Sequence, residues 1–316
     1  MATLRDSSFI LTVLNTILPV FSNNILPIFI VAAFGFALRR TTDVDKRALS
    51  RVVFFVFSPA LIFSLIVGSD LEAGEIGRLS LFALLAIMGM GTLAFAVGRA
   101  LRLPREAQTL LMLAAMFGNS GNFGLALNEL RYGTEGLARA AVYYTISGIL
   151  QWTLGSLVAA LGQSSLKEAL SRIGRLPIIY AVLIAFPVYL LDLSLPQPVL
   201  SAVTIAGRAA VPVMLILLGM QLADVRSISN LKLALPAVGL RLLIAPLLAF
   251  ALATALGLKG LGFNTSMLQA SVPPAVATIV VATEYDIAPE IMTSVVVIAT
   301  LLSPITMVAL IQILGL

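Results

Sequence analysis

Two short runs of helix-breaking and polar residues interrupt stretches that are otherwise apolar enough to cross a membrane. The first run is Gly118-Asn119-Ser120-Gly121-Asn122, and the second is Pro273-Pro274. An interrupted helix leaves backbone N–H and C=O groups without intrahelical partners, and hydrocarbon tolerates this only where the break faces protein or a watery cavity. The sequence therefore predicts that the functional site lies at these two breaks.

The residue types at the breaks suit an anion. Glycine lowers the cost of leaving helical geometry, and proline has no N–H, so one helix must end and another can begin there. If the breaks cross, two helix N-termini meet near the middle of the bilayer, each with roughly half a positive charge. Amides and hydroxyls beside them can bind a carboxylate. The predicted substrate-binding residues are Asn119, Ser120, Gly121, Asn122, Gln269, Ser271, Pro273 and Pro274.

Helix packing is the alternative interpretation of the same residues. Small and amide residues in membrane helices often serve packing, and a glycine or proline often marks only a kink. One isolated Gly-x-x-Gly would favour packing, whereas a second break in an equivalent place favours binding. For Gln269 and Ser271 taken singly, both interpretations stay open.

The composition is that of a polytopic membrane protein. The chain has 316 residues, of which 59% are hydrophobic and 11% charged, with a mean hydropathy of +1.05. It has no cysteine and no histidine, which excludes disulfides, thiolate chemistry and imidazole metal sites. No catalytic residue, metal or cofactor is predicted. We interpret the net charge of +5 as loop charge that orients the chain, so the expected partners are the lipid bilayer and a small organic anion, not nucleic acid.

Apolar windows of about 20 residues predict an all-α protein with ten transmembrane helices. Their approximate bounds are 25–38, 52–67, 79–101, 107–130, 137–161, 176–191, 199–222, 233–256, 263–283 and 291–314. This divides the chain into a lead-in (1–24), a first five-helix repeat (25–162), a cytoplasmic linker (163–175) and a second repeat (176–316). We expect the lead-in to be an interfacial helix or an extension of the first span. A signal peptide is the alternative, but Arg5 is offset by Asp6 and no small-residue cleavage pattern follows.

The distribution of lysine and arginine predicts the orientation. If the loop after the first span is cytoplasmic, thirteen basic residues lie on that side and five on the other. Cytoplasmic loops carry the excess of these residues, so both termini are expected outside the cytoplasm. We therefore predict a multi-pass protein of the cell (inner) membrane.

A weak internal repeat runs through the chain with a nearly constant shift. The matches are Leu26-Pro27-Ile28 with Leu176-Pro177-Ile178 (150 residues), Pro59 with Pro212 and Tyr132 with Tyr285 (153), and Ala100-Leu101 with Ala255-Leu256 (155). Each half holds five spans, an odd number, so the halves must have opposite topology. Inverted repeats with breaks in corresponding spans are typical of secondary transporters whose site lies at the bilayer midplane.

Charged and aromatic residues inside the spans are few. No acidic residue lies near a span centre, which argues against coupling through a buried carboxylate. For Arg208 and Arg241 we expect a snorkelling side chain or a structural pair, the alternative being a guanidinium that pairs with an anionic substrate. We expect Tyr143 and Tyr144 to belong to the aromatic belt at the membrane surface.

Three motifs resemble the auxin efflux carrier family of bacteria and plants. They are the run from Gly118 to Leu125 with Tyr132-Gly133 after it, the turn Ser271-Val272-Pro273-Pro274-Ala275 with Tyr285 after it, and Pro59-Ala60-Leu61-Ile62-Phe63. The resemblance implies an inverted five-plus-five repeat in which broken helices four and nine cross, as in NhaA and the bile-acid symporters. It also implies a scaffold of helices 1, 2, 6 and 7, moving helices 3–5 and 8–10, and carriage of organic anions such as auxin-like acids or dicarboxylates. A homodimer through the scaffold would fit this family.

The chain departs from the family pattern in two places. Ala126 stands where the family often has a proline, so glycines alone must make the first break. Only residues 162–175 separate spans five and six, which indicates a compact bacterial type without a regulatory loop.

A secondary active transporter that exports its substrate by an elevator-type mechanism is the favoured hypothesis. A sodium-coupled importer built like the bile-acid symporters is its alternative. An intramembrane enzyme lacks a central nucleophile or metal site, and a channel or receptor would need a polar stripe or a soluble domain.

Overall fold

The protein is almost entirely helical. The computed structural model describes residues 17–160, 174, 176–225 and 228–316; parts of the predicted lead-in and linker lie outside them. Within these residues every regular element is a helix, and the one β-type pairing is an isolated antiparallel bridge between Gly118 and Pro274. The helices, with η for π-helical turns, are η1 (Phe21–Ile25), α2 (Leu26–Thr41), α3 (Lys46–Val52), η2 (Val53–Phe57), α4 (Ser58–Val67), α5 (Ala73–Ala100), α6 (Arg105–Met116), η3 (Ser120–Leu125), α7 (Ala126–Leu150), η4 (Gln151–Gly155), α8 (Ser156–Ala159), α10 (Pro177–Leu190), α11 (Gln197–Arg208), α12 (Ala210–Ala223), α13 (Leu231–Gly239), η5 (Leu240–Ile244), α14 (Ala245–Ala255), α15 (Gly260–Ser271), α16 (Ala277–Glu284) and α17 (Pro289–Leu314).

Six helical stretches of the described chain are long and apolar enough to cross a membrane. They are Ile17–Thr41, Lys46–Val67, Ala73–Ala100, Gln197–Ala223, Leu231–Ala255 and Pro289–Leu314, and Pro177–Leu190 is a shorter apolar helix. Two predicted spans, 107–130 and 263–283, are not continuous helices, because the breaks divide them into α6 with η3 and α15 with α16. The described part of the lead-in, from Ile17, is continuous with the first of these stretches.

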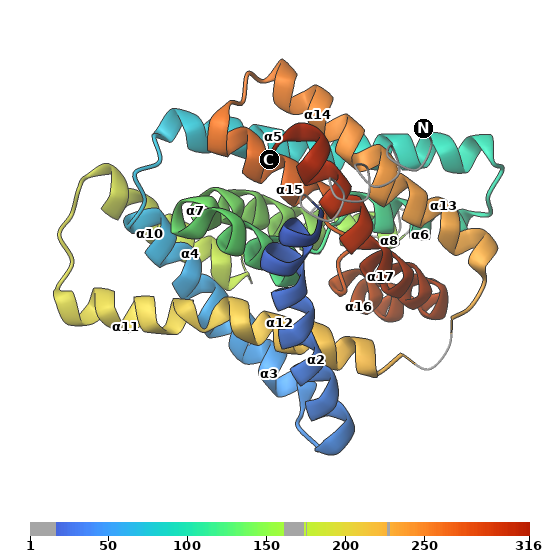
Figure 1. Cartoon of the computed structure of the whole chain (residues 1–316), viewed down its shortest axis with the longest axis horizontal. Coiled ribbons are helices and arrows are strands. Elements are labelled where there is room, and N and C mark those ends of the chain that lie inside the picture. The colour runs from blue at the N-terminus through green and yellow to red at the C-terminus, as the bar shows by residue number, and fades with distance from the viewer. Residues whose placement is uncertain (1–16, 161–173, 175, 226–227) are drawn as a thin grey trace, which may run out of the picture.

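A first group of helices consists of α2, α4, α10, α11 and α12. Within it, α2 and α12 pack at unusually close range. α2 lies against α12, where a Cβ on Gly35 would overlap the backbone carbonyl of Ile216 and a Cβ on Gly219 that of Ala32. Small residues allow such close backbone approach between membrane helices. α4 packs against α10 and α11, and Figure 1 shows α11 and α12 along the lower part of the molecule with α5 along its upper part.

A second group of helices, α5 to α7 and α13 to α17, contains the two broken helices and the helices packed around them. α5 packs against α6, α7 and α14, and α15 packs against α7 and α14. α17 contacts α13 and α16. These contacts place both interrupted segments between continuous helices of the second group, so these helices enclose the breaks on one side.

Large apolar side chains point outward from several helices. Leu183 on α10, Ile205 on α11 and Ile313 on α17 are each more than three-fifths exposed. Such surfaces are unfavourable in water and suit hydrocarbon. Together with the apolar helices above, they make this chain a multi-pass membrane protein.

Candidate functional site

The two predicted breaks lie side by side and pair through their backbones. The N–H of Asn119 donates to the carbonyl of Pro273 at 2.7 Å, and the N–H of Ala275 donates to the carbonyl of Phe117 at 2.8 Å. These bonds flank the Gly118–Pro274 bridge. Groups that the interruption leaves without helical partners are thus satisfied by the other break, as hydrocarbon requires. We call residues 117–120 and 272–275 the paired breaks.

Four helix ends converge on the paired breaks. α6 ends at Met116 and α15 at Ser271, and both chains continue in extended geometry at Phe117 and Val272. η3 begins at Ser120 and runs directly into α7, while α16 begins at Ala277. Two partially negative C-termini therefore arrive at the paired breaks and two partially positive N-termini leave them.

Arg241 is a component of the site whose role the sequence did not reveal. Its Nε donates to the Val272 carbonyl at 2.8 Å and its Nη1 to the Ala115 carbonyl at 3.0 Å. The residue is only 1% exposed, so it does not snorkel to the membrane surface. It instead takes a structural position that joins both broken helices. The signal in the sequence was a lone arginine deep in a span, in a chain without any central acid.

Gly118 makes room for this arginine. A Cβ at Gly118 would overlap Nη2 of Arg241 and would lie 2.9 Å from a methyl carbon of Val272. The φ angle of Gly118 is not in the left-handed region. Glycine is needed here for the close approach of a guanidinium, and not for backbone freedom.

The predicted polar side chains lie in and around the paired breaks. Asn119, Ser120, Gln269 and Ser271 are all buried, whereas Asn122 is partly exposed and makes no hydrogen bond with the described residues. Gln269 donates from Nε2 to the Ala140 carbonyl at 3.0 Å, and its other amide atom lies against Gly124. Three buried atoms have no hydrogen-bond partner within the described chain: Nδ2 of Asn119, Oε1 of Gln269 and Oγ of Ser271.

The tyrosines predicted for the membrane belt face the interior instead. Tyr143 is 3% exposed, packs against Phe82 with ring centroids 6.2 Å apart, and interacts with Arg241. The ring of Tyr144 lies against Gly121, and its hydroxyl donates to Oγ of Ser58 at 3.3 Å. The belt interpretation is wrong for both, because the rotation of α7 turns them toward α5 and α4, which the span boundaries alone do not determine.

No acidic side chain shares this environment. Every described aspartate and glutamate is exposed except Glu75, which is partly buried and pairs with Arg139 through Nε at 2.7 Å. In the described residues no cluster of three or more metal-ligating side chains occurs. The site therefore offers donors, helix ends and one fixed positive charge.

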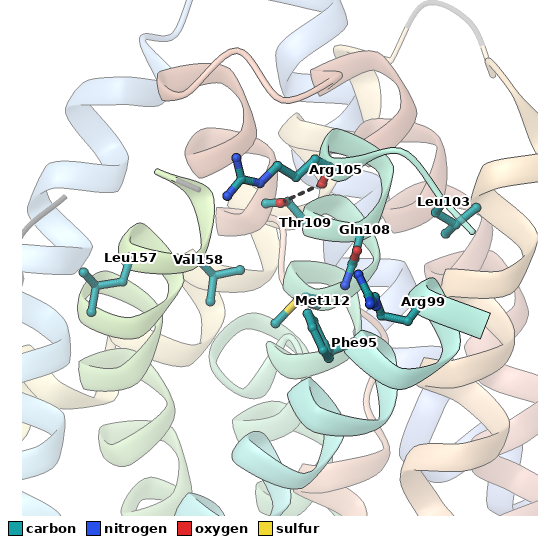
Figure 2. A pocket seen from close by; sticks show the side chains of 9 residues that line it. All are labelled: Phe95, Arg99, Leu103, Arg105, Gln108, Thr109, Met112, Leu157 and Val158. Carbon is teal, nitrogen blue, oxygen red and sulfur yellow. Dashed lines mark hydrogen bonds between the residues drawn. The ribbon is translucent and has the colours of Figure 1, made fainter. Parts of the chain in front are cut away.

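A separate hollow lies at the beginning of α6. Its volume is about 520 Å³, and Figure 2 shows Arg99 from α5, Arg105 and Gln108 from α6, and Leu157 and Val158 from α8 around it. None of the predicted substrate-binding residues lines it. Arg99 and Arg105 line this hollow, but it is not the predicted substrate-binding site.

Comparison with known proteins gives a consistent family assignment. The model of a family described as "Membrane transport protein" matches residues 20–311. An "Uncharacterized transporter" of Methanothermobacter thermautotrophicus is 29% identical over 90% of this chain and 96% of its own length, and one of Methanocaldococcus jannaschii is 25% identical over 88% and 93%. A "Putative malonate transporter" of Rhizobium meliloti is 26% identical over 90% and 93%. The resemblance seen in the sequence is confirmed: the chain belongs to the membrane transport protein family of auxin efflux carriers and is a transporter, not an enzyme.

Proposed function

We propose that this transporter carries small organic anions and binds them at the paired breaks. The observation that carries the proposal is the convergence of two helix N-termini and unpaired donors in a region without any acidic side chain. Such an arrangement attracts an anion and gives a cation no fixed partner. The malonate in the name of the Rhizobium meliloti relative is a small dicarboxylate and agrees with this class.

The inverted repeat that we propose for the fold is supported by its turns. Arg102 and Gly257, 155 residues apart, both have positive φ, and each precedes a leucine whose N–H closes the preceding helix end. Gly133 and Asp286, 153 apart, also share positive φ. Equivalent turns at the same shifts support ten helices in two halves, the fourth and ninth of which cross at the paired breaks.

Each predicted residue has a role in this proposal. Pro273 and Pro274 prevent α15 from continuing, and the Pro273 carbonyl accepts from the Asn119 N–H. Gly121 leaves room for the ring of Tyr144 beside the start of η3. Ser120 and Asn122 stand in the first turn after the first break, with the Asn122 side chain free to reach a carboxylate. Nδ2 of Asn119 and Oγ of Ser271 complete the donor set, while Gln269, whose Nε2 donates to the Ala140 carbonyl, positions the break.

Alternating access would move the second group of helices against the first. The tight α2–α12 contact suits a rigid scaffold made of predicted spans 1, 2, 6 and 7, which correspond to α2, α4, α10 and α11–α12. The proposed mechanism is export by an elevator motion of the second group past this scaffold. The Lys/Arg bias supports location in the cell (inner) membrane with both termini outside, and a homodimer would form through the scaffold.

Ligand-dependent stability of the purified full-length protein tests the function. Malonate, malate and indole-3-acetate are added separately, with and without sodium, and the apparent Tm is measured. A ligand that binds only the folded state raises the Tm by mass action, so at least one of these anions should do so. A shift produced by neutral solutes or cations, but by none of the anions, would overturn the proposal.

A pair of asparagine variants tests the site. Asn122→Ala should abolish the anion-induced shift and leave the ligand-free Tm near that of the wild type, because this side chain has no partner in the described structure. Asn23→Ala removes the same group from an exposed position in η1 and serves as the matched control. Undiminished anion binding by Asn122→Ala would assign Asn122 to packing.

A further inference from the structure

The guanidinium of Arg241 occupies the point where the C-terminal ends of both broken helices meet. Ala115 belongs to the last turn of α6, and Val272 follows the last residue of α15. Their carbonyls accept hydrogen bonds from Nη1 and Nε of the same guanidinium, at 3.0 and 2.8 Å. One fixed cation therefore serves two helix ends that come from the two halves of the chain.

Helix C-termini that converge away from water are stabilised by a positive charge. Each carries roughly half a negative charge on its free carbonyls. In secondary transporters with broken helices, unwound carbonyls and half-helix C-terminal ends are the groups that coordinate sodium. In this chain the arginine side chain already fills that position. Building on the proposed anion transport, we propose that Arg241 is a built-in cation that replaces a coupling sodium ion at the paired breaks.

The surroundings of Arg241 exclude a direct role as the substrate's binding partner. Its Nη2 has no hydrogen-bond partner in the described residues, but it lies against Gly118 in the space that a side chain would take. Its Nε and Nη1 are already engaged by the carbonyls of Val272 and Ala115. Arg241 is a positioning residue that acts on the site through the backbone of the paired breaks.

The charges at the paired breaks then determine whether the site prefers an anion or a cation. Two C-termini, with roughly one negative charge between them, are balanced by the guanidinium. Two N-termini, with roughly one positive charge between them, have no acidic partner among the described side chains. The remaining positive potential selects an anion, and no sodium is needed to hold the crossing together.

The effect of sodium on stability, without any organic anion, tests this proposal. The apparent Tm is measured in sodium chloride and in N-methyl-D-glucamine chloride at equal ionic strength for wild type, Arg241→Met and Arg208→Met. Wild type should show the same Tm in both salts. Arg241→Met should melt earlier, and sodium should restore part of the loss in a saturable manner that the bulky organic cation does not reproduce. Arg208→Met, at an exposed arginine, should behave like wild type.

The outcomes separate this proposal from the proposed function. A purely structural arginine would lower the Tm of Arg241→Met equally in both salts, which would overturn the replacement of sodium. If Arg241→Met does not fold, wild-type malonate binding decides: equal affinity within twofold in the two salts supports the proposal, and a tenfold dependence on sodium overturns it. If wild type binds no organic anion, the proposed function fails, while the two-salt comparison of wild type and Arg241→Met still decides the role of Arg241.

Discussion

The two halves of the chain interrupt their broken helices by different chemical means. The first break depends on space: a Cβ at Gly118, Gly121 or Gly124 would meet a side chain from another helix at less than ordinary contact distance. The second break depends on proline: Pro273 and Pro274 remove backbone donors, and the Pro273 carbonyl accepts from Asn119. Two breaks that pair with each other can therefore be made by unrelated residue types. The two breaks should also differ in what they tolerate.

The largest effect is expected from Gly118→Ala in the first break. The added methyl must displace the Arg241 guanidinium, and that movement would break its hydrogen bonds to the carbonyls of Val272 and Ala115 in the two broken helices. Separating a buried charge from its partners costs about 3–5 kcal/mol. We expect a much lower Tm in detergent and no anion-induced stabilisation.

Gly148→Ala is the control for this variant. Gly148 lies in α7, and a Cβ there meets nothing within 4 Å. Alanine in a helix should raise stability by about 0.5–1 kcal/mol relative to glycine. If Gly118→Ala and Gly148→Ala melted alike, the first break would not depend on space and the comparison would be lost.

The positions of the two breaks could be predicted from the residue types, whereas the directions in which individual side chains point could not. Glycines, amides and prolines placed both interruptions correctly within the sequence, because helix breaking is a local property. The roles of Arg241, Tyr143 and Tyr144 depend on how α7 and the α13–η5–α14 segment rotate about their axes, and packing with distant helices determines that rotation. Arg241 could have been suspected, since a lone charge in a span has few inexpensive positions.

Gly124→Ala should have an intermediate effect. Its methyl would overlap Oε1 of Gln269, the far end of a flexible side chain that can rotate away at the loss of its bond to Ala140. Overpacking of this kind costs about 1–3 kcal/mol. A double-mutant cycle with Gln269→Ala, followed by thermal unfolding, should show that the two changes are less than additive. Full additivity would mean that Gly124 does not make room for Gln269.

Pro274→Ala should cost less than either glycine change. The bridge is closed by bonds from the neighbouring residues, so the nitrogen of residue 274 points away from Gly118 and both bonds survive. The main loss is the rigidity of proline in the unfolded chain, about 0.4–1 kcal/mol. Anion binding should persist with a slightly lower Tm. Loss of binding as complete as in Gly118→Ala would show that the second break tolerates substitution no better than the first.

A surface ion pair gives the smallest effect and a contrast in pH dependence. Arg39 donates from Nε to Asp224 at 2.7 Å, and Lys46 also bonds Asp224, with all three side chains about one-third exposed. Partial burial favours the neutral acid, but the hydrogen bonds and charges of Lys46 and Arg39 outweigh it and hold the pKa of Asp224 below its ordinary value of 3.8.

Asp224→Asn should therefore lose at most about 1 kcal/mol at neutral pH, discounted for solvent screening. Because the pKa is depressed in the folded protein, the contribution of Asp224 is complete above the ordinary carboxyl pKa and disappears as the pH falls through the folded value. Thermal unfolding at pH 7 and near pH 3 should show the difference between wild type and Asp224→Asn shrinking at the lower pH. The deficit of Gly118→Ala should persist at both, since a guanidinium does not titrate there. A Gly118→Ala deficit that vanished in acid would mean that carboxylates outside the paired breaks, and not the fit of Arg241 beside Gly118, stabilise the joint.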